Sequence, residues 1–179
     1  MKKYEFTGET KIVVGVTLKR IRALISFGFV VKGEIGGFIE DEKNLSHDGN
    51  AWVADNACVA DNACVAGNAC VAGNARVAGN AWVTGNARVT GNARVTGNAR
   101  VTNTTDYMLI GSIGSRNDFT TFYKDIDGGI SVKCGCFSGT IEEFREKVEE
   151  THGTNTKHAK IYKVAADLAE MQILDQEAE

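Results

Sequence analysis

Residues 50–103 repeat one six-residue sequence nine times without interruption. Each copy begins with Asn-Ala, continues with a variable residue and Val, and ends with a pair such as Ala-Asp, Ala-Gly or Thr-Gly. An α-helix has no such period, whereas a short strand followed by a tight turn does. In that strand Ala and Val point to one side and the variable residue points to the other. The Gly-Asn and Asp-Asn pairs form the turns, because both residue types tolerate positive φ.

A fixed short period is typical of a solenoid, in which each coil buries its inner face against its neighbours. The repeat Val-Ala-Gly-Asn-Ala-Arg resembles the hexapeptide repeat of left-handed parallel β-helices, with Val as the aliphatic position and Ala as the small one. In that family three hexads form one triangular coil and the chains assemble as trimers. The resemblance therefore implies three regular coils, about 15 Å tall at one strand spacing per coil, in a homotrimer.

The stacking rule of that family aligns the variable outward residues into three rows. All four arginines fall in the later half of the repeat, so one end is basic on every side. One interpretation is that outward positions need only soluble residues, and the other is that the rows form subunit contacts or line a groove between subunits. Exposed tryptophan is costly and favours the second. The rows are Trp52/Cys70/Arg88, Cys58/Arg76/Arg94 and Cys64/Trp82/Arg100.

Residues 1–49 are predicted to form an N-terminal cap with strands. Apolar residues at 4–6 and 12–16 indicate strands around a turn at residues 8–10, and residues 18–24 form a short amphipathic stretch, helical or extended. Ile39 and Leu45 are already one hexad apart, which predicts an imperfect first coil. Two extra residues between Leu45 and Val53 break the register.

Three segments carry a closer resemblance, namely Leu18-Lys-Arg-Ile-Arg-Ala-Leu, Gly33-Glu-Ile-Gly-Gly-Phe-Ile-Glu and Asn44-Leu-Ser-His-Asp-Gly-Asn-Ala-Trp-Val. Followed by hexads, they resemble hexapeptide-repeat proteins of bacterial prophages and phages, which are often labelled transferase-like from the repeat alone. The resemblance covers the first 105 residues, and the tail is similar to the domain that such phage proteins carry. It implies a fold rather than an activity.

The remainder of the chain differs from the repeat in charge and pattern. Residues 106–179 hold 8 basic and 14 acidic side chains, against 4 and 2 in residues 50–105, so we place a domain boundary near residues 103–105. Residues 106–179 are predicted to form a small α+β domain with strands at 107–113, 119–123 and 130–137 and two helices. A capping box at Thr140 and Glu143 opens the first helix, and the second begins near Thr156.

A glycine-rich turn at residues 111–118 is the first candidate site. Ser115, Arg116 and Asn117 on such a turn can offer backbone N–H groups and a guanidinium to an anion. The alternative is a plain hairpin turn in which Asp118 pairs with Arg116.

Two further candidates contain histidine. Cys134 and Cys136 on one face of a strand, with His152 and His158, have the ligand types of a zinc site, but buried cysteines and a helix-terminating histidine explain them better, so no metal is predicted. Hexapeptide acyltransferases use a histidine as general base at a groove between subunits. His47 is the histidine of the N-terminal half, but it lies outside the hexads, none of which contains a histidine. We therefore assign His47 to the cap turn and predict no catalytic residue and no cofactor.

Composition narrows the function classes. A net charge of −3 argues against duplex nucleic-acid binding. No apolar run approaches 18 residues and the first residues do not form a signal peptide, so no membrane contact is expected. Five cysteines, an odd number, fit a reducing cytoplasm.

The sequence therefore predicts a cytoplasmic, non-catalytic binding protein, a homotrimer or dimer of trimers, that sequesters a small anionic, nucleotide-like host defence signal between subunits. Trp52 or Trp82 would stack on a base. The alternatives are an inhibitor that binds a host enzyme and, third, a hexapeptide acyltransferase. The phosphates would be held by Arg76, Arg88, Arg94, Arg100 or Arg116.

Overall fold

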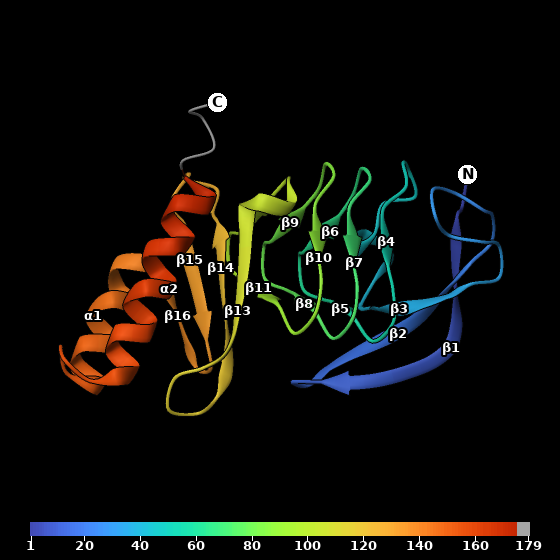
Figure 1. The fold of residues 1–179 in the computed structure, drawn as a ribbon. Coiled ribbons are helices and arrows are strands. Elements are labelled where there is room, and N and C mark those ends of the chain that lie inside the picture. Colours follow the sequence, from blue (N-terminus) through green and yellow to red (C-terminus); the bar gives the residue numbers. More distant parts are fainter. Residues whose placement is uncertain (175–179) are drawn as a thin grey trace. The chain divides into compact units, whose positions relative to one another are not determined.

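The computed structural model describes residues 1–174 of the chain. They belong to two compact units, Met1–Thr104 and Thr105–Glu179, joined through a 3₁₀ turn, η2 (Thr104–Asp106). The chain is mainly β, with two helices near its C-terminus (Figure 1).

The first unit is a parallel β-solenoid of about 4 turns. Each hexad contributes one two-residue strand, and these strands form the parallel stacks β4-β7-β10, β5-β8-β11 and β6-β9-β12. Residues eighteen apart are paired, which confirms the three predicted rows. The strands are β4 (Trp52–Val53), β5 (Cys58–Val59), β6 (Cys64–Val65), β7 (Cys70–Val71), β8 (Arg76–Val77), β9 (Trp82–Val83), β10 (Arg88–Val89), β11 (Arg94–Val95) and β12 (Arg100–Val101).

Side chains at the corners connect successive coils. Asparagine amides form ladders, as where Asn50 Nδ2 donates to Asn68 Oδ1 at 3.0 Å. Two hexads have aspartate at the position where six others have glycine. Asp55 takes φ 54°, and its Oδ2 accepts the N–H of Gly73 in the next coil at 2.9 Å. Aspartate therefore keeps the left-handed turn that glycine provides elsewhere and adds a contact between coils.

The N-terminal segment extends one sheet of the solenoid. β1 (Tyr4–Val13) and β2 (Val16–Ala23) form an antiparallel hairpin, and β3 (Ile35–Ile39) joins β2 to β5. The predicted turn at residues 8–10 is wrong. Gly8 produces an irregularity within β1, and the chain reverses at Val14-Gly15, where φ is 51° and 81°. The amphipathic stretch 18–24 is extended, since most of it lies in β2.

The imperfect first coil is present. Ile39 pairs with Val59 and Leu45 with Val65, twenty residues apart instead of eighteen, because two residues are inserted before Val53. The 3₁₀ turn of this coil, η1 (Glu42–Asn44), packs against β6.

Buried polar side chains close the N-terminal edge of the first regular coil. Asn44 Nδ2 donates to Ala63 O at 2.8 Å and to Asp61 O at 3.1 Å. Lys3 Nζ donates to Ala51 O at 2.8 Å. These donors occupy the positions that backbone N–H groups of a preceding coil would take, so the edge carbonyls are paired.

The second unit packs two helices on one face of an antiparallel sheet. The prediction of three strands is wrong, because Gly135, at φ 57°, breaks the segment 130–137 into a hairpin and adds a fourth. Helix α1 packs on β15 and β16, and α2 packs on β13 and β14. The elements are β13 (Tyr107–Ile113), β14 (Asp118–Lys124), β15 (Ile130–Cys134), β16 (Phe137–Thr140), α1 (Ile141–His152) and α2 (Lys157–Ile173).

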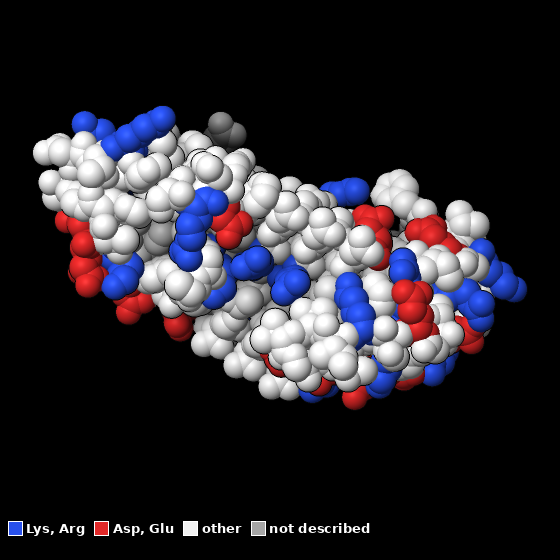
Figure 2. Space-filling model, turned by 90° about the horizontal axis from the view of Figure 1, so that it is seen from below, with Lys and Arg blue, Asp and Glu red and all other residues white. Residues whose placement is uncertain are grey.

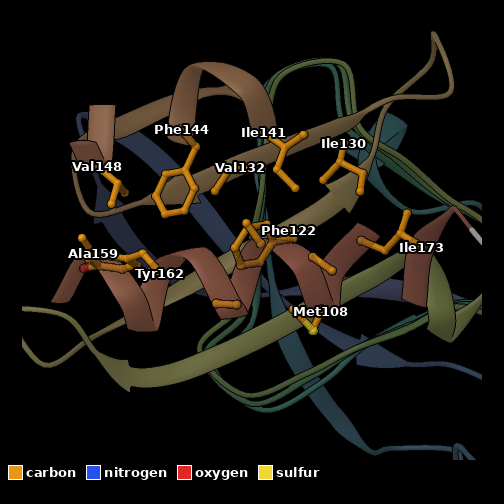
Figure 3. Packing of buried hydrophobic residues seen from close by; sticks show 13 residues of the cluster. Met108, Phe122, Ile130, Val132, Ile141, Phe144, Val148, Ala159, Tyr162 and Ile173 are labelled. Atoms are coloured by element: carbon orange, nitrogen blue, oxygen red, sulfur yellow. The ribbon is translucent and has the colours of Figure 1, made fainter. Parts of the chain in front are cut away.

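The core of this unit lies between the sheet and the helices. Phe144 of α1 meets Phe122 of β14 and Tyr162 of α2 edge to face, at ring-centroid distances of 5.7 and 5.5 Å (Figure 3). The predicted capping box is present: Thr140 Oγ1 accepts the N–H of Glu143, and Glu143 Oε2 accepts the N–H of Thr140.

Candidate ligand-binding groove

A groove of about 450 Å³ runs beside the stack β4-β7-β10 of the solenoid. The row Trp52/Cys70/Arg88 lies along it, because parallel pairing aligns these outward side chains. The loop between β2 and β3 supplies the opposite wall through Gly28, Phe29, Val30 and Glu34, and the ladder Asn50/Asn68/Asn86 also lines the groove.

Trp52 lines the groove, but its side chain is buried. It is 3% exposed and packs edge to face on Phe27, with ring centroids 5.5 Å apart. Its outward position on the coil agrees with the predicted row, yet the β2–β3 loop covers it. Its indole nitrogen is buried, and it has no hydrogen-bond partner among the described residues. The burial of this N–H leaves a donor to be satisfied beside the groove.

Arg88 supplies the guanidinium in this groove. It is exposed on its strand and lies two coils from Trp52, about 10 Å along the solenoid at one strand spacing per coil. Cys70, between them, is partly buried, and that burial raises the pKa of its thiol while the Arg88 charge opposes the rise. Glu34 is the acidic residue of the lining, and its carboxylate accepts the N–H of Val31 at 3.0 Å.

The other predicted solenoid residues lie on the two remaining faces. Arg76 and Arg94 are exposed in the row that begins with Cys58, which is buried against Leu18 of β2 and Phe38 of β3. The third row carries Trp82, which is 52% exposed, and Arg100. Of the six predicted Trp and Arg side chains of the repeat, the groove thus brings together Trp52 and Arg88.

The predicted anion turn lies in the second unit, between β13 and β14. The guanidinium of Arg116 packs over the turn at Gly135, where an added Cβ would stand 2.7 Å from Nη2. Asn117 takes φ 49°, and its N–H donates to Gly114 O at 3.3 Å. Ser115 is exposed on the same turn. These residues therefore form a hairpin turn of the second unit.

His47 belongs to the N-terminal cap. Its ring stacks on Tyr4 at a centroid distance of 4.3 Å, and Nδ1 accepts the N–H of Lys3 at 3.2 Å. Nε2 is buried 3.9 Å from a carboxylate oxygen of Glu42. Burial lowers the pKa of His47, against the opposing effect of the Glu42 charge. Both ring nitrogens face protein groups, as expected for a residue of the cap.

The two C-terminal thiols do not share a strand face. Cys134 ends β15, where Thr120 Oγ1 donates to its Sγ at 3.2 Å, whereas Cys136 is exposed in the following turn. The expectation of one strand face was wrong because Gly135 reverses the chain between them. His152 and His158 lie near each other, with ring centroids 5.7 Å apart. Within residues 1–174, no three His, Cys, Asp or Glu side chains are grouped closely enough to hold a metal ion.

The groove's second wall was missed in the sequence. The signal available there was the apolar run Phe27-Gly-Phe-Val-Val, which contains Gly28, is followed by Gly33 and belongs to no repeat. Both glycines have positive φ.

Basic and acidic side chains are interspersed on the molecular face shown in Figure 2. Neither described helix has the length and hydrophobicity that crossing a membrane requires.

The chain matches no protein-family model, and no curated protein shows significant similarity to it. The resemblance to phage hexapeptide-repeat proteins therefore rests on the sequence segments themselves, and the arrangement of the groove is the evidence for function.

Proposed function

We propose that the protein is a phage-type, non-catalytic binding protein that sequesters a small anionic, nucleotide-like ligand in the groove beside β4, β7 and β10. The observation that carries the proposal is the groove in which Arg88, at the end of the row Trp52/Cys70/Arg88, faces the β2–β3 loop with its exposed Phe29. An aromatic surface and a guanidinium in one cavity match a ligand that joins a planar ring to a phosphate.

The chemistry of the lining fits this ligand class. The Arg88 guanidinium can hold a phosphate by two parallel hydrogen bonds, which a lysine in its place could not do. Phe29, which is exposed, offers aromatic surface to a ring, and the Asn ladder offers amide groups to polar substituents. A volume of about 450 Å³ lies within the range of sites that bind small organic molecules.

The proposal includes a homo-oligomer, a trimer or a dimer of trimers, in which a neighbouring subunit closes the open side of the groove. The support comes from the third row, because Trp82 is 52% exposed at an outward position of a regular coil. The phage-like segments support a host defence signal as the ligand and the host cytoplasm as the place of action.

Native mass spectrometry tests the proposal. The protein is purified from cells that make nucleotide defence signals and, in parallel, from cells that lack them. We expect a mass excess of a few hundred daltons per site in the first sample alone. Arg88→Ala should abolish the excess. Arg76→Ala is the matched control, since it removes an equally placed arginine from a different row.

Purified protein is then titrated with a panel of mono-, di- and cyclic nucleotides by calorimetry. An oligomer with no mass excess that also binds none of the panel would refute the proposal, and so would a ligand that Arg88→Ala retains. In the first case a protein partner becomes the leading explanation, and a pull-down compared with a Trp82→Ala variant would identify it.

A further inference from the structure

The second unit has an apolar surface that its own core does not use. Val164, Leu168 and Met171 of α2 are 65%, 47% and 64% exposed. Val164 and Leu168 lie beside Ile110 and Ile113 of β13, with a shallow hollow of about 360 Å³ between helix and strand. Scattered apolar side chains on a surface need no explanation, but a continuous group from two elements does.

The exposed row is a second apolar face of α2. The core face of this helix consists of residues such as Ala159, Tyr162, Ala166 and Ala169, which are buried against the sheet and α1. The residues 161, 164, 168 and 171 follow one another at spacings of three and four, as on one side of a helix, and carry Ile, Val, Leu and Met. A helix that packed on one sheet only would have polar residues there.

The strand beside this row extends its apolar surface. β13 is the first strand in the order β13-β14-β15-β16 of its sheet. Its Ile110 and Ile113 line the hollow together with Ile161, Val164 and Leu168 of the helix. Its sequence, Tyr-Met-Leu-Ile-Gly-Ser-Ile, has neither a charged residue nor a proline. The helix row and these strand side chains therefore form one apolar surface.

The charges of α2 indicate what kind of partner fits. Lys157, Lys160 and Lys163 occupy its first half, whereas Asp167 and Glu170 occupy its second half. Asp167 and Glu170 bind Arg145 of α1 at 2.7 Å, but their side chains remain 49% and 39% exposed. A helix that is basic in one half and acidic in the other is complementary to a copy of itself running in the opposite direction.

We propose that this surface binds a second copy of the same chain across a twofold axis. The Ile161, Val164, Leu168 and Met171 faces of the two α2 helices pack together in opposite directions. The arrangement is isologous, since the same residues of both copies meet. The proposal concerns assembly and holds independently of the ligand proposed for the solenoid groove. Of the two assemblies proposed above, it is compatible with the dimer of trimers and excludes the isolated trimer.

The molar mass of the full chain in solution is the first test, measured by light scattering during size-exclusion chromatography. The wild-type protein is expected at an even multiple of 19.2 kDa, and the double variant Val164→Lys/Leu168→Lys at half that mass. Ile126→Lys is the control, because Ile126 is 59% exposed in the same unit but lies in the β14–β15 turn. A wild-type monomer, an odd multiple, or an even mass that the double variant keeps would overturn the proposal.

A charge-reversal experiment distinguishes a second copy from an unrelated partner. Lys160→Glu/Lys163→Glu gives the first half of α2 a net negative charge like the second half, and Asp167→Lys/Glu170→Lys gives the second half a positive charge like the first. Each variant alone should show the halved mass through like-charge repulsion, and an equimolar mixture should recover the full mass. Circular dichroism melting of each variant verifies folding. Folded variants that keep the full mass separately, or whose mixture stays at half mass, would refute the antiparallel arrangement.

Discussion

Lys3 makes the stability of the solenoid unit depend on pH in a specific way. Its side chain is 1% exposed, with Nζ 2.8 Å from Ala51 O and 4.8 Å from the ring centroid of Phe27. Burial lowers the pKa of Lys3 from 10.5 to about 8, although the charge of Asp48 works in the opposite direction. Folding therefore favours the neutral amine, which can still donate a hydrogen bond to Ala51 O.

The sign of the effect follows from proton binding. Between about pH 8 and pH 10.5 the unfolded chain keeps the Lys3 proton that the folded chain releases, so the free energy of unfolding rises with pH. At 1.36 kcal/mol per pKa unit the full rise amounts to roughly 3 kcal/mol. Tyr4 acts oppositely, since burial and then the charges of Glu42 and Asp41 raise the pKa of its phenol. Above pH 10 ionisation of Tyr4 in the unfolded chain lowers stability, so we expect a maximum near pH 10.

Urea unfolding followed by tryptophan fluorescence measures this, because both tryptophans lie in the solenoid unit. The wild-type midpoint should rise from pH 7.5 to pH 10 and then fall. Lys3→Met should remove the rise, and Tyr4→Phe should remove the alkaline fall. If Lys3→Met and wild type show the same dependence between pH 8 and pH 10, burial of Lys3 does not control it and the reasoning fails.

Two further predictions concern the coil edges and turns, with urea unfolding as the measurement. Asn44→Ala should lower the free energy of unfolding by about 3 kcal/mol, because the carbonyls of Asp61 and Ala63 lose their donor. Asn44→Asp should cost at least as much. An unchanged urea midpoint in both variants would contradict the edge-capping role. Gly97→Ala should cost about 1 kcal/mol, since φ is 65° and its Cβ would meet nothing within 4 Å. Gly85→Ala should cost clearly more, because its Cβ would lie 2.4 Å from the carbonyl oxygen of Thr102, and equal costs at the two glycines would show that crowding is absent.

The solenoid could be predicted from sequence because its determinants are local and repeated. Each hexad carries its own inward Val and Ala and its own turn, so a single stacking rule predicts all three rows. The six-residue step from Ile39 to Leu45 likewise predicts the imperfect first coil. The helices of the second unit were similarly accessible, since the capping box at Thr140 is a local pattern.

Errors arose where a single glycine had two permitted roles. Gly8 suggested a turn but forms an irregularity within β1, and the reversal occurs at Val14-Gly15. Gly135 lies within an apolar, strand-like run, yet it adopts φ 57° and divides the run into β15 and β16. Glycine permits both conformations at little cost, so pairing with neighbouring strands decides between them.

The groove shows why a repeat alone does not define a site. Trp52 and Trp82 occupy the same outward position of their hexads, and the stacking rule treats them alike. They are nevertheless 3% and 52% exposed, because the loop from residues 24 to 34 covers Trp52. That loop belongs to no hexad, and its contact with Trp52 spans a large sequence separation that no periodic pattern encodes. The structural asymmetry among the three faces therefore originates in the non-repetitive segment. Under the proposed function, Phe29 and Glu34 are the positions where substitutions should change ligand preference.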